Sequence, residues 1–159
     1  MRSSAKKMLL LLGALALVVS ACGGDDEGGD TTAAPVGDEP VANACPDSGC
    51  SITIAGVEKS GDELKLTWDA NFLPDVSKNH IHVYWDTFQA EEVSSDAEAN
   101  GFTQGDWSPT GDYPEYVTES GASVANRGSS TTLCVTAADR DHAILDATLV
   151  QCRDVADEL

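Results

Sequence analysis

The sequence predicts an all-β fold, an antiparallel β-sandwich with room for one short helix. Three observations support this. Apolar and polar residues alternate in several short runs, turn-forming residues separate these runs about every ten positions, and helical periodicity is nearly absent. The clearest run is residues 80–86, where Ile81, Val83 and Trp85 alternate with polar residues and a tyrosine. A period of two places the two sets on opposite faces of a strand.

Residues 1–21 are expected to be a signal peptide. A basic start is followed by twelve uncharged residues, 8–19, which is too short a run to span a bilayer and is typical of a secretory signal. Val19-Ser20-Ala21-Cys22 resembles the lipobox of bacterial lipoproteins. The resemblance implies cleavage before Cys22 and attachment of lipid to its sulfur. The alternative is an ordinary secretory signal cut near Ala21, which would leave Cys22 as a free thiol.

Lipidation would place the protein outside the cytoplasm, held through Cys22 at the outer face of the cytoplasmic membrane or in the cell envelope. Several acyl chains on one residue suffice for stable anchoring. Residues 22–44 are expected to be a disordered linker, because after Cys22 they contain five glycines, two prolines, six acidic residues and no aromatic residue. The β-sandwich domain would then span residues 45–159.

The charge of this domain narrows the classes of partner. From residue 45 to 159 there are 21 acidic residues and six basic ones, a net charge of −15 out of −18 for the whole chain. Such a surface repels nucleic acid and anionic lipid headgroups, so neither is expected as a partner. Cations and basic proteins would be attracted, although an acidic surface also serves solubility alone.

The remaining four cysteines, Cys45, Cys50, Cys134 and Cys152, are expected to form two disulfides, because an exported protein meets an oxidising environment. Four cysteines allow three pairings. A Cys45–Cys50 bridge would close a Pro- and Gly-containing turn. If the last two strands pair so that Ala137 faces Leu149, Cys134 faces Cys152 at a distance that suits a disulfide.

The other elements are expected in the following order. Strands are predicted around residues 52–57, 64–68, 80–87, 131–138 and 144–153, with a short helix at 89–100 and short strands near 116–118 and 122–125. Residues 89–128 have the least regular pattern. Four aromatic residues there are expected either to pack on the core or to form a binding surface: Phe102, Trp107, Tyr113 and Tyr116.

Three segments carry a further resemblance: Leu64-Lys65-Leu66-Thr67-Trp68, His82-Val83-Tyr84-Trp85 and Leu133-Cys134-Val135-Thr136-Ala137. They are similar to the second, third and sixth strands of fibronectin type III and other immunoglobulin-like domains. Two departures argue against an antibody-type domain. The second strand has no cysteine, and Thr132 stands where the corner tyrosine would be. The resemblance implies a fold and assigns no function.

The strongest candidate for a chemical site is His80-x-His82. Alternate strand residues project from one face about 6.6 Å apart, so that two imidazoles can converge on one metal ion. The third ligand would have to be His142, the only other histidine, in a polar turn between the last two strands. Zn(II) or Cu(II) would suit such a set. A Cu(I) chaperone is disfavoured because both methionines precede Cys22. The alternative is that His80 and His82 are polar side chains on a solvated sheet face.

Other motifs give less support for a site. Asp139, Asp141 and Asp146 could suggest calcium, but the glycine and glutamate of an EF-hand loop are missing. Neither a nucleophile motif nor a phosphate-binding loop occurs, so no catalytic residue is assigned. Two functions follow as hypotheses: a non-catalytic surface module that binds an unidentified protein or small ligand, or a Zn(II)- or Cu(II)-binding protein that uses His80 and His82.

Overall fold

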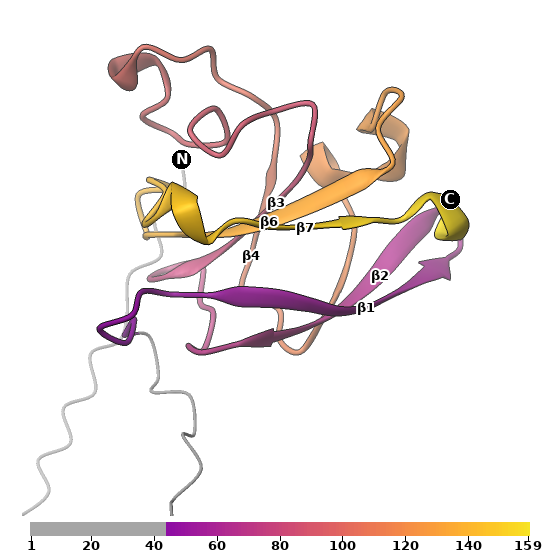
Figure 1. Ribbon diagram of the computed structural model, residues 1–159, viewed down its shortest axis with the longest axis horizontal. Helices are drawn as coiled ribbons and strands as arrows, with labels where there is room; N and C mark the ends of the chain where they lie inside the picture. The colour runs from indigo at the N-terminus through magenta and orange to yellow at the C-terminus, as the bar shows by residue number, and fades with distance from the viewer. Residues whose placement is uncertain (1–43) are drawn as a thin grey trace, which may run out of the picture. The chain divides into compact units, whose positions relative to one another are not determined.

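The computed structural model describes residues 44–159. Two antiparallel sheets face each other, which confirms the β-sandwich (Figure 1). The three-stranded sheet has the order β1-β2-β5, with β1 at Ile52–Ser60, β2 at Glu63–Ala70 and β5 at Glu115–Val117. The four-stranded sheet has the order β4-β3-β6-β7, with β4 at Ser108–Thr110, β3 at His80–Trp85, β6 at Thr132–Ala138 and β7 at Gln151–Asp154.

The hydrophobic core lies between the two sheets. Trp68 of β2 is fully buried and stacks on Tyr116 of β5, with ring centroids 5.5 Å apart. From the other sheet, β3 and β6 contribute the alternating set predicted from the sequence: Ile81, Val83, Trp85, Leu133, Val135 and Ala137. Full burial of one such side chain stabilises the fold by about 1.5–3 kcal/mol. Within residues 44–159, no helix is both long and apolar enough to cross a membrane.

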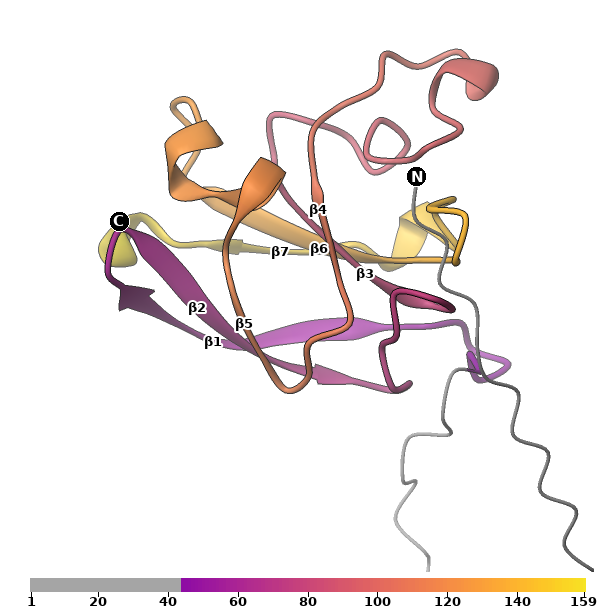
Figure 2. The same ribbon diagram turned by 180° about the vertical axis from the view of Figure 1, so that it is seen from behind.

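The second face of the four-stranded sheet is also covered. Figures 1 and 2 show residues 86–107 and the segment between β6 and β7 on the side of this sheet that points away from β1 and β2. Tyr84 and Cys134 pack there with Val93, Trp107 and Ile144. Every residue of β3 is therefore buried. The alternative in which His80 and His82 lie on a solvated sheet face is therefore wrong, because loops without a regular sequence pattern form a second layer over them.

The middle of the chain differs from the prediction in three respects. Residues 89–100 contain only one turn of 3-10 helix, η1 at Glu98–Asn100, and not a longer helix. Residues 122–125 are not a strand. They belong to two 3-10 turns, η2 at Ser120–Ala122 and η3 at Val124–Asn126. Strand β4 was not predicted, because its three residues are too few for a period of two to be recognised.

Both predicted disulfides are present, Cys45–Cys50 and Cys134–Cys152. Cys134 and Cys152 are directly opposed on β6 and β7, as expected, but the predicted Ala137–Leu149 pair does not form. Leu149 lies in the 3-10 turn η4, Ala147–Leu149, and β6 instead continues into an isolated bridge between Ala138 and Ile144. The segment between Ala138 and Ile144 therefore forms a turn, and this turn contains His142. A last 3-10 turn, η5 at Ala156–Glu158, ends the domain.

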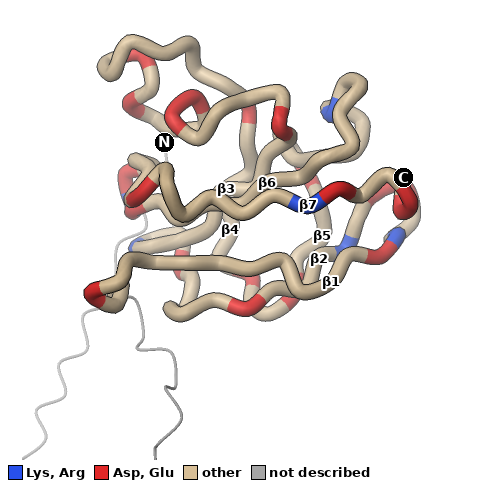
Figure 3. The backbone as a smooth tube through the Cα atoms, viewed as in Figure 1, with Lys and Arg blue, Asp and Glu red and all other residues tan. Residues whose placement is uncertain are grey.

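Acidic residues are distributed over loops of both layers, with few basic residues among them (Figure 3). Two ion pairs join Lys65 of β2 to Glu58 and Glu115 on the neighbouring strands. The predicted signal peptide, Cys22 and the linker up to residue 43 lie outside the described residues.

Candidate metal centre

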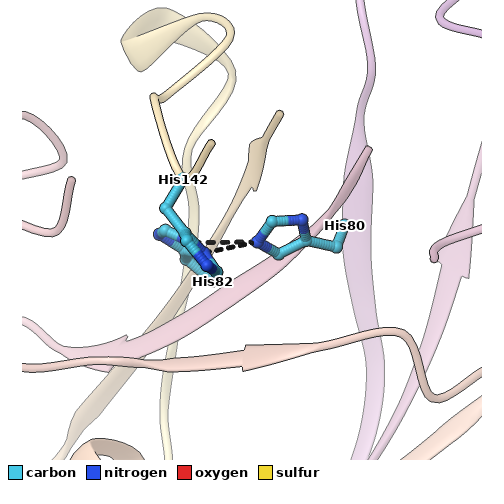
Figure 4. Close-up of side chains that lie close together, drawn as sticks. All are labelled: His80, His82 and His142. Atoms are coloured by element: carbon cyan, nitrogen blue, oxygen red, sulfur yellow. Dashed lines mark hydrogen bonds between the residues drawn. The ribbon is translucent and has the colours of Figure 1, made fainter. Parts of the chain in front are cut away.

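Three histidine side chains converge on one point (Figure 4). Nε2 of His80 lies 3.1 Å from Nε2 of His82 and 3.0 Å from Nδ1 of His142. Nε2 of His82 lies 3.2 Å from the same Nδ1. Within residues 44–159, this is the one group of three or more histidine, cysteine or acidic side chains whose ligand atoms gather in this way. The structure thus brings together the three residues that the sequence singled out.

Strand β3 supplies two of the rings by simple alternation. Ile81 points into the core, so His80 and His82 both project from the opposite face. Each is fully buried. The rings tilt toward each other at 48°, with centroids 5.0 Å apart.

His142 arrives from a short turn after β6. Its φ is +64°, in the left-handed region that few residues other than glycine adopt. Oδ1 of Asp139 accepts hydrogen bonds from the backbone N–H groups of Asp141 and Ala143 and so holds the turn closed. The carbonyl oxygen of His142 accepts hydrogen bonds from the Ser95 N–H and the Ser94 hydroxyl. The turn thus brings His142 over the sheet face that carries His80 and His82.

Hydrogen bonds to the backbone define which nitrogen of each β3 histidine carries its proton. Nδ1 of His82 lies 2.7 Å from the carbonyl oxygen of Val93, and Nδ1 of His80 lies 3.2 Å from that of Lys78. A carbonyl oxygen can only accept, so both Nδ1 atoms are the donors. In the neutral rings both Nε2 atoms therefore present lone pairs to the centre of the cluster. A backbone partner of this kind is the usual support of a metal-ligating histidine.

The surroundings keep the two buried rings neutral. Burial lowers the pKa of His82 to about 3, and the neighbouring His80 and His142 add to this effect. Burial also lowers the pKa of His80, although Asp139 and Asp75 oppose the shift. The indole of Trp107 stacks on His82 with ring centroids 5.1 Å apart and forms one wall of the site. Neutral imidazole is the form that binds metal.

The spacing of the three nitrogens fits a single ion. A tetrahedral zinc ion with nitrogens at about 2.0–2.1 Å holds them about 3.3–3.4 Å apart. The observed separations of 3.0–3.2 Å require the triangle to widen by only about 0.1–0.4 Å. Three protein ligands leave a fourth tetrahedral position for an exchangeable ligand. Zinc sites in enzymes commonly have this open arrangement, and closed structural sites do not.

The predicted alternatives find less support. Asp139 uses its oxygen to close the turn, and Asp146 accepts hydrogen bonds from the N–H and hydroxyl of Thr148. Neither belongs to a ligand cluster with Asp141 among the described residues. Of the four loop aromatics, Tyr116 and Trp107 pack inward, whereas Phe102 and Tyr113 remain about one third exposed. The contributions of Trp107 and of the Val93 carbonyl were not predicted, since neither has a sequence signal.

No protein family model, no curated protein and no solved structure matches this chain significantly. Its function has to be argued from the geometry of the site.

Proposed function

We propose that this protein is an exported, lipid-anchored domain that binds one divalent transition-metal ion through His80, His82 and His142. Of the two functions considered from the sequence, the structure favours the metal-binding protein over a surface module without a metal. The histidines are drawn from elements 60 residues or more apart in the chain, and yet their nitrogens converge.

One observation carries the proposal. Three ring nitrogens face each other within 3.2 Å in a buried site, although His80 and His82 have committed their protons to backbone carbonyls. If Nδ1 of His142 carries a proton, this single N–H faces two acceptors, and if it does not, three lone pairs face one another. Buried acceptors without donors are costly, about 1–3 kcal/mol each. A cation at the centre would satisfy all three lone pairs at once.

The donor set favours Zn(II) or Cu(II). Imidazole suits both ions, and no thiolate is available because the four cysteines of the domain are paired as disulfides. The acidic surface supports the same reading, since a net charge of −15 raises the local concentration of cations.

The decisive experiment is a titration of the metal-free protein with Zn²⁺ and Cu²⁺, with thermal unfolding as the measurement. At a metal concentration a hundred times the dissociation constant, binding adds about 2.7 kcal/mol of stability. For a domain of this size, the melting temperature should rise by roughly 10 °C. The variant His142→Asn should lose the rise, because it removes one ligand while asparagine tolerates the left-handed backbone.

The matched control is Asp141→Asn, which changes an exposed neighbour in the same turn and should keep the rise. No shift of the unmutated protein at millimolar metal would refute the proposal. The surface module that binds a protein or small ligand without a metal would then be the better reading.

The anchor is supported by the sequence pattern at Cys22. A Cys22→Ala variant should move from the membrane fraction to the soluble exported fraction, with immunodetection of both fractions as the measurement. A variant that stays with the membrane would contradict lipidation at this residue.

A further inference from the structure

A threonine hydroxyl beneath the histidines has no partner. Thr136 of β6 is fully buried, and among the described residues its Oγ1 has no hydrogen-bond partner. Thr136 pairs directly with His82 across the β3–β6 ladder. Side chains of such a pair share one face of the sheet, with Cβ atoms about 4.5–5.5 Å apart.

The neighbouring residues show that Thr136 belongs to the floor of the site. Its flanking residues Val135 and Ala137 point into the core, so the Thr136 side chain points to the histidine side. The next β6 residue on that side is Ala138, which pairs with His80 and carries no polar group. Thr136 is therefore the one β6 side chain opposite the two β3 histidines that can form a hydrogen bond.

We propose that the Thr136 hydroxyl is a hydrogen-bond partner of the fourth ligand on the metal ion, and that this ligand is an exchangeable water or small anion. The inference rests on the proposed metal site. Three histidines leave one tetrahedral position open, and an unpaired buried hydroxyl is costly unless something is present for it to bind. A hydroxyl can accept from a water and can also donate to an anion, so it serves both ligands.

Exchange of the fourth ligand requires a route to solvent. His80 and His82 are fully buried, but His142 is partly exposed and lies on the solvent side of the cluster. Small ligands would enter beside His142. The chemical class that fits is a compact anion, because the fourth position lies beside side chains that are fully buried: His80, His82 and Thr136.

The test uses cobalt as a visible substitute for zinc and azide as a probe anion. Cobalt-loaded protein is titrated with azide while the visible absorption spectrum is followed. Three proteins are compared: unmutated, Thr136→Val, which removes the hydroxyl at nearly constant shape, and Thr136→Ser, which keeps it. Because a hydroxyl bonds an anion more strongly than a neutral water, the valine variant should bind azide about fivefold to tenfold more weakly. The serine variant should stay within about twofold.

A second measurement separates this role from a structural one. The metal-free Thr136→Val variant should melt at the same temperature as the unmutated protein or at a higher one, because it loses an unpaired buried group. Equal azide affinity in the valine and unmutated proteins would overturn the role of Thr136. A cobalt spectrum that azide does not change would overturn the open fourth position. Failure of the unmutated protein to bind cobalt at all would instead refute the metal site itself.

Discussion

Acid should destabilise the metal-free protein in a pH range where carboxylates contribute little. The group responsible is His82, whose burial and neighbouring rings lower its pKa from the ordinary 6.5 to about 3. In the unfolded chain the same imidazole returns to the ordinary value. The unfolded state therefore binds a proton as the pH falls below 6.5, while the folded state remains neutral, and folding stability decreases.

The magnitude follows from the two pKa values. The contribution of His82 is fully present above pH 6.5 and is lost progressively as the pH falls toward 3. At pH 5, about 1.5 units below the ordinary pKa, protonation of this imidazole stabilises the unfolded state by about 2 kcal/mol. His80, whose pKa is also lowered, adds to the loss. Carboxylates with lowered pKa, such as Glu63, act only below their ordinary value of 4.5.

Urea denaturation at pH 8, 6.5 and 5 in the presence of a chelator measures this directly. The free energy of unfolding should fall by at least about 2 kcal/mol between pH 8 and pH 5. His142→Asn should retain most of the decrease because His82 is still present, whereas His82→Gln should lose a large part of it. A free energy of unfolding that is level from pH 8 to pH 5 would refute the description of His82 as a neutral buried ring.

Two further predictions concern the residues around the site. Asp139→Ala removes the acceptor that closes the His142 turn and should weaken Zn²⁺ affinity about tenfold, as loss of a supporting hydrogen bond usually does, whereas Asp139→Asn should keep most of the affinity. A competition assay with a coloured chelator measures the Zn²⁺ affinity of both variants. Equal affinities in the unmutated protein and the two variants would contradict a positioning role of Asp139. Cu²⁺ binding should quench tryptophan fluorescence mainly through Trp107, because its indole stacks on His82. The variant Trp107→Phe should therefore lose most of the quenching. Unchanged quenching in this variant would place the copper elsewhere.

The regular part of the fold could be predicted because a period of two survives in strands with one face on the core. Leu64, Leu66 and Trp68 alternate cleanly, and Cys134–Cys152 follows from the pairing of two such strands. Strand β4 is stabilised by its pairing with β3, and its three residues are too few to show an alternation of apolar and polar residues in the sequence. The 3-10 turns near residue 122 replace a predicted strand because the backbone groups there form local turn hydrogen bonds instead of a ladder.

The three residues of the candidate site could be predicted from the sequence, but the residues that surround them could not. The spacing of His80 and His82 on a strand fixes their common face, and with three histidines in the chain the third member could only be His142. Their burial could not be inferred, because residues 86–107 cover them with a layer of irregular loops. Thr136 had no recognisable signal, since its role depends on its pairing with His82 across the ladder.

The three histidines come from two separate elements, β3 and the turn after β6, and this has a consequence for maturation. Before folding, only His80 and His82 are near each other, and His142 is 60 residues or more away. His142 joins them only after β6 has paired with β3 and the turn beyond it has closed. On the proposed function, a chain that crosses a membrane unfolded would therefore travel without a complete metal site. It would take its ion from the compartment in which it folds, so that the metal supply of that compartment would decide which ion is loaded.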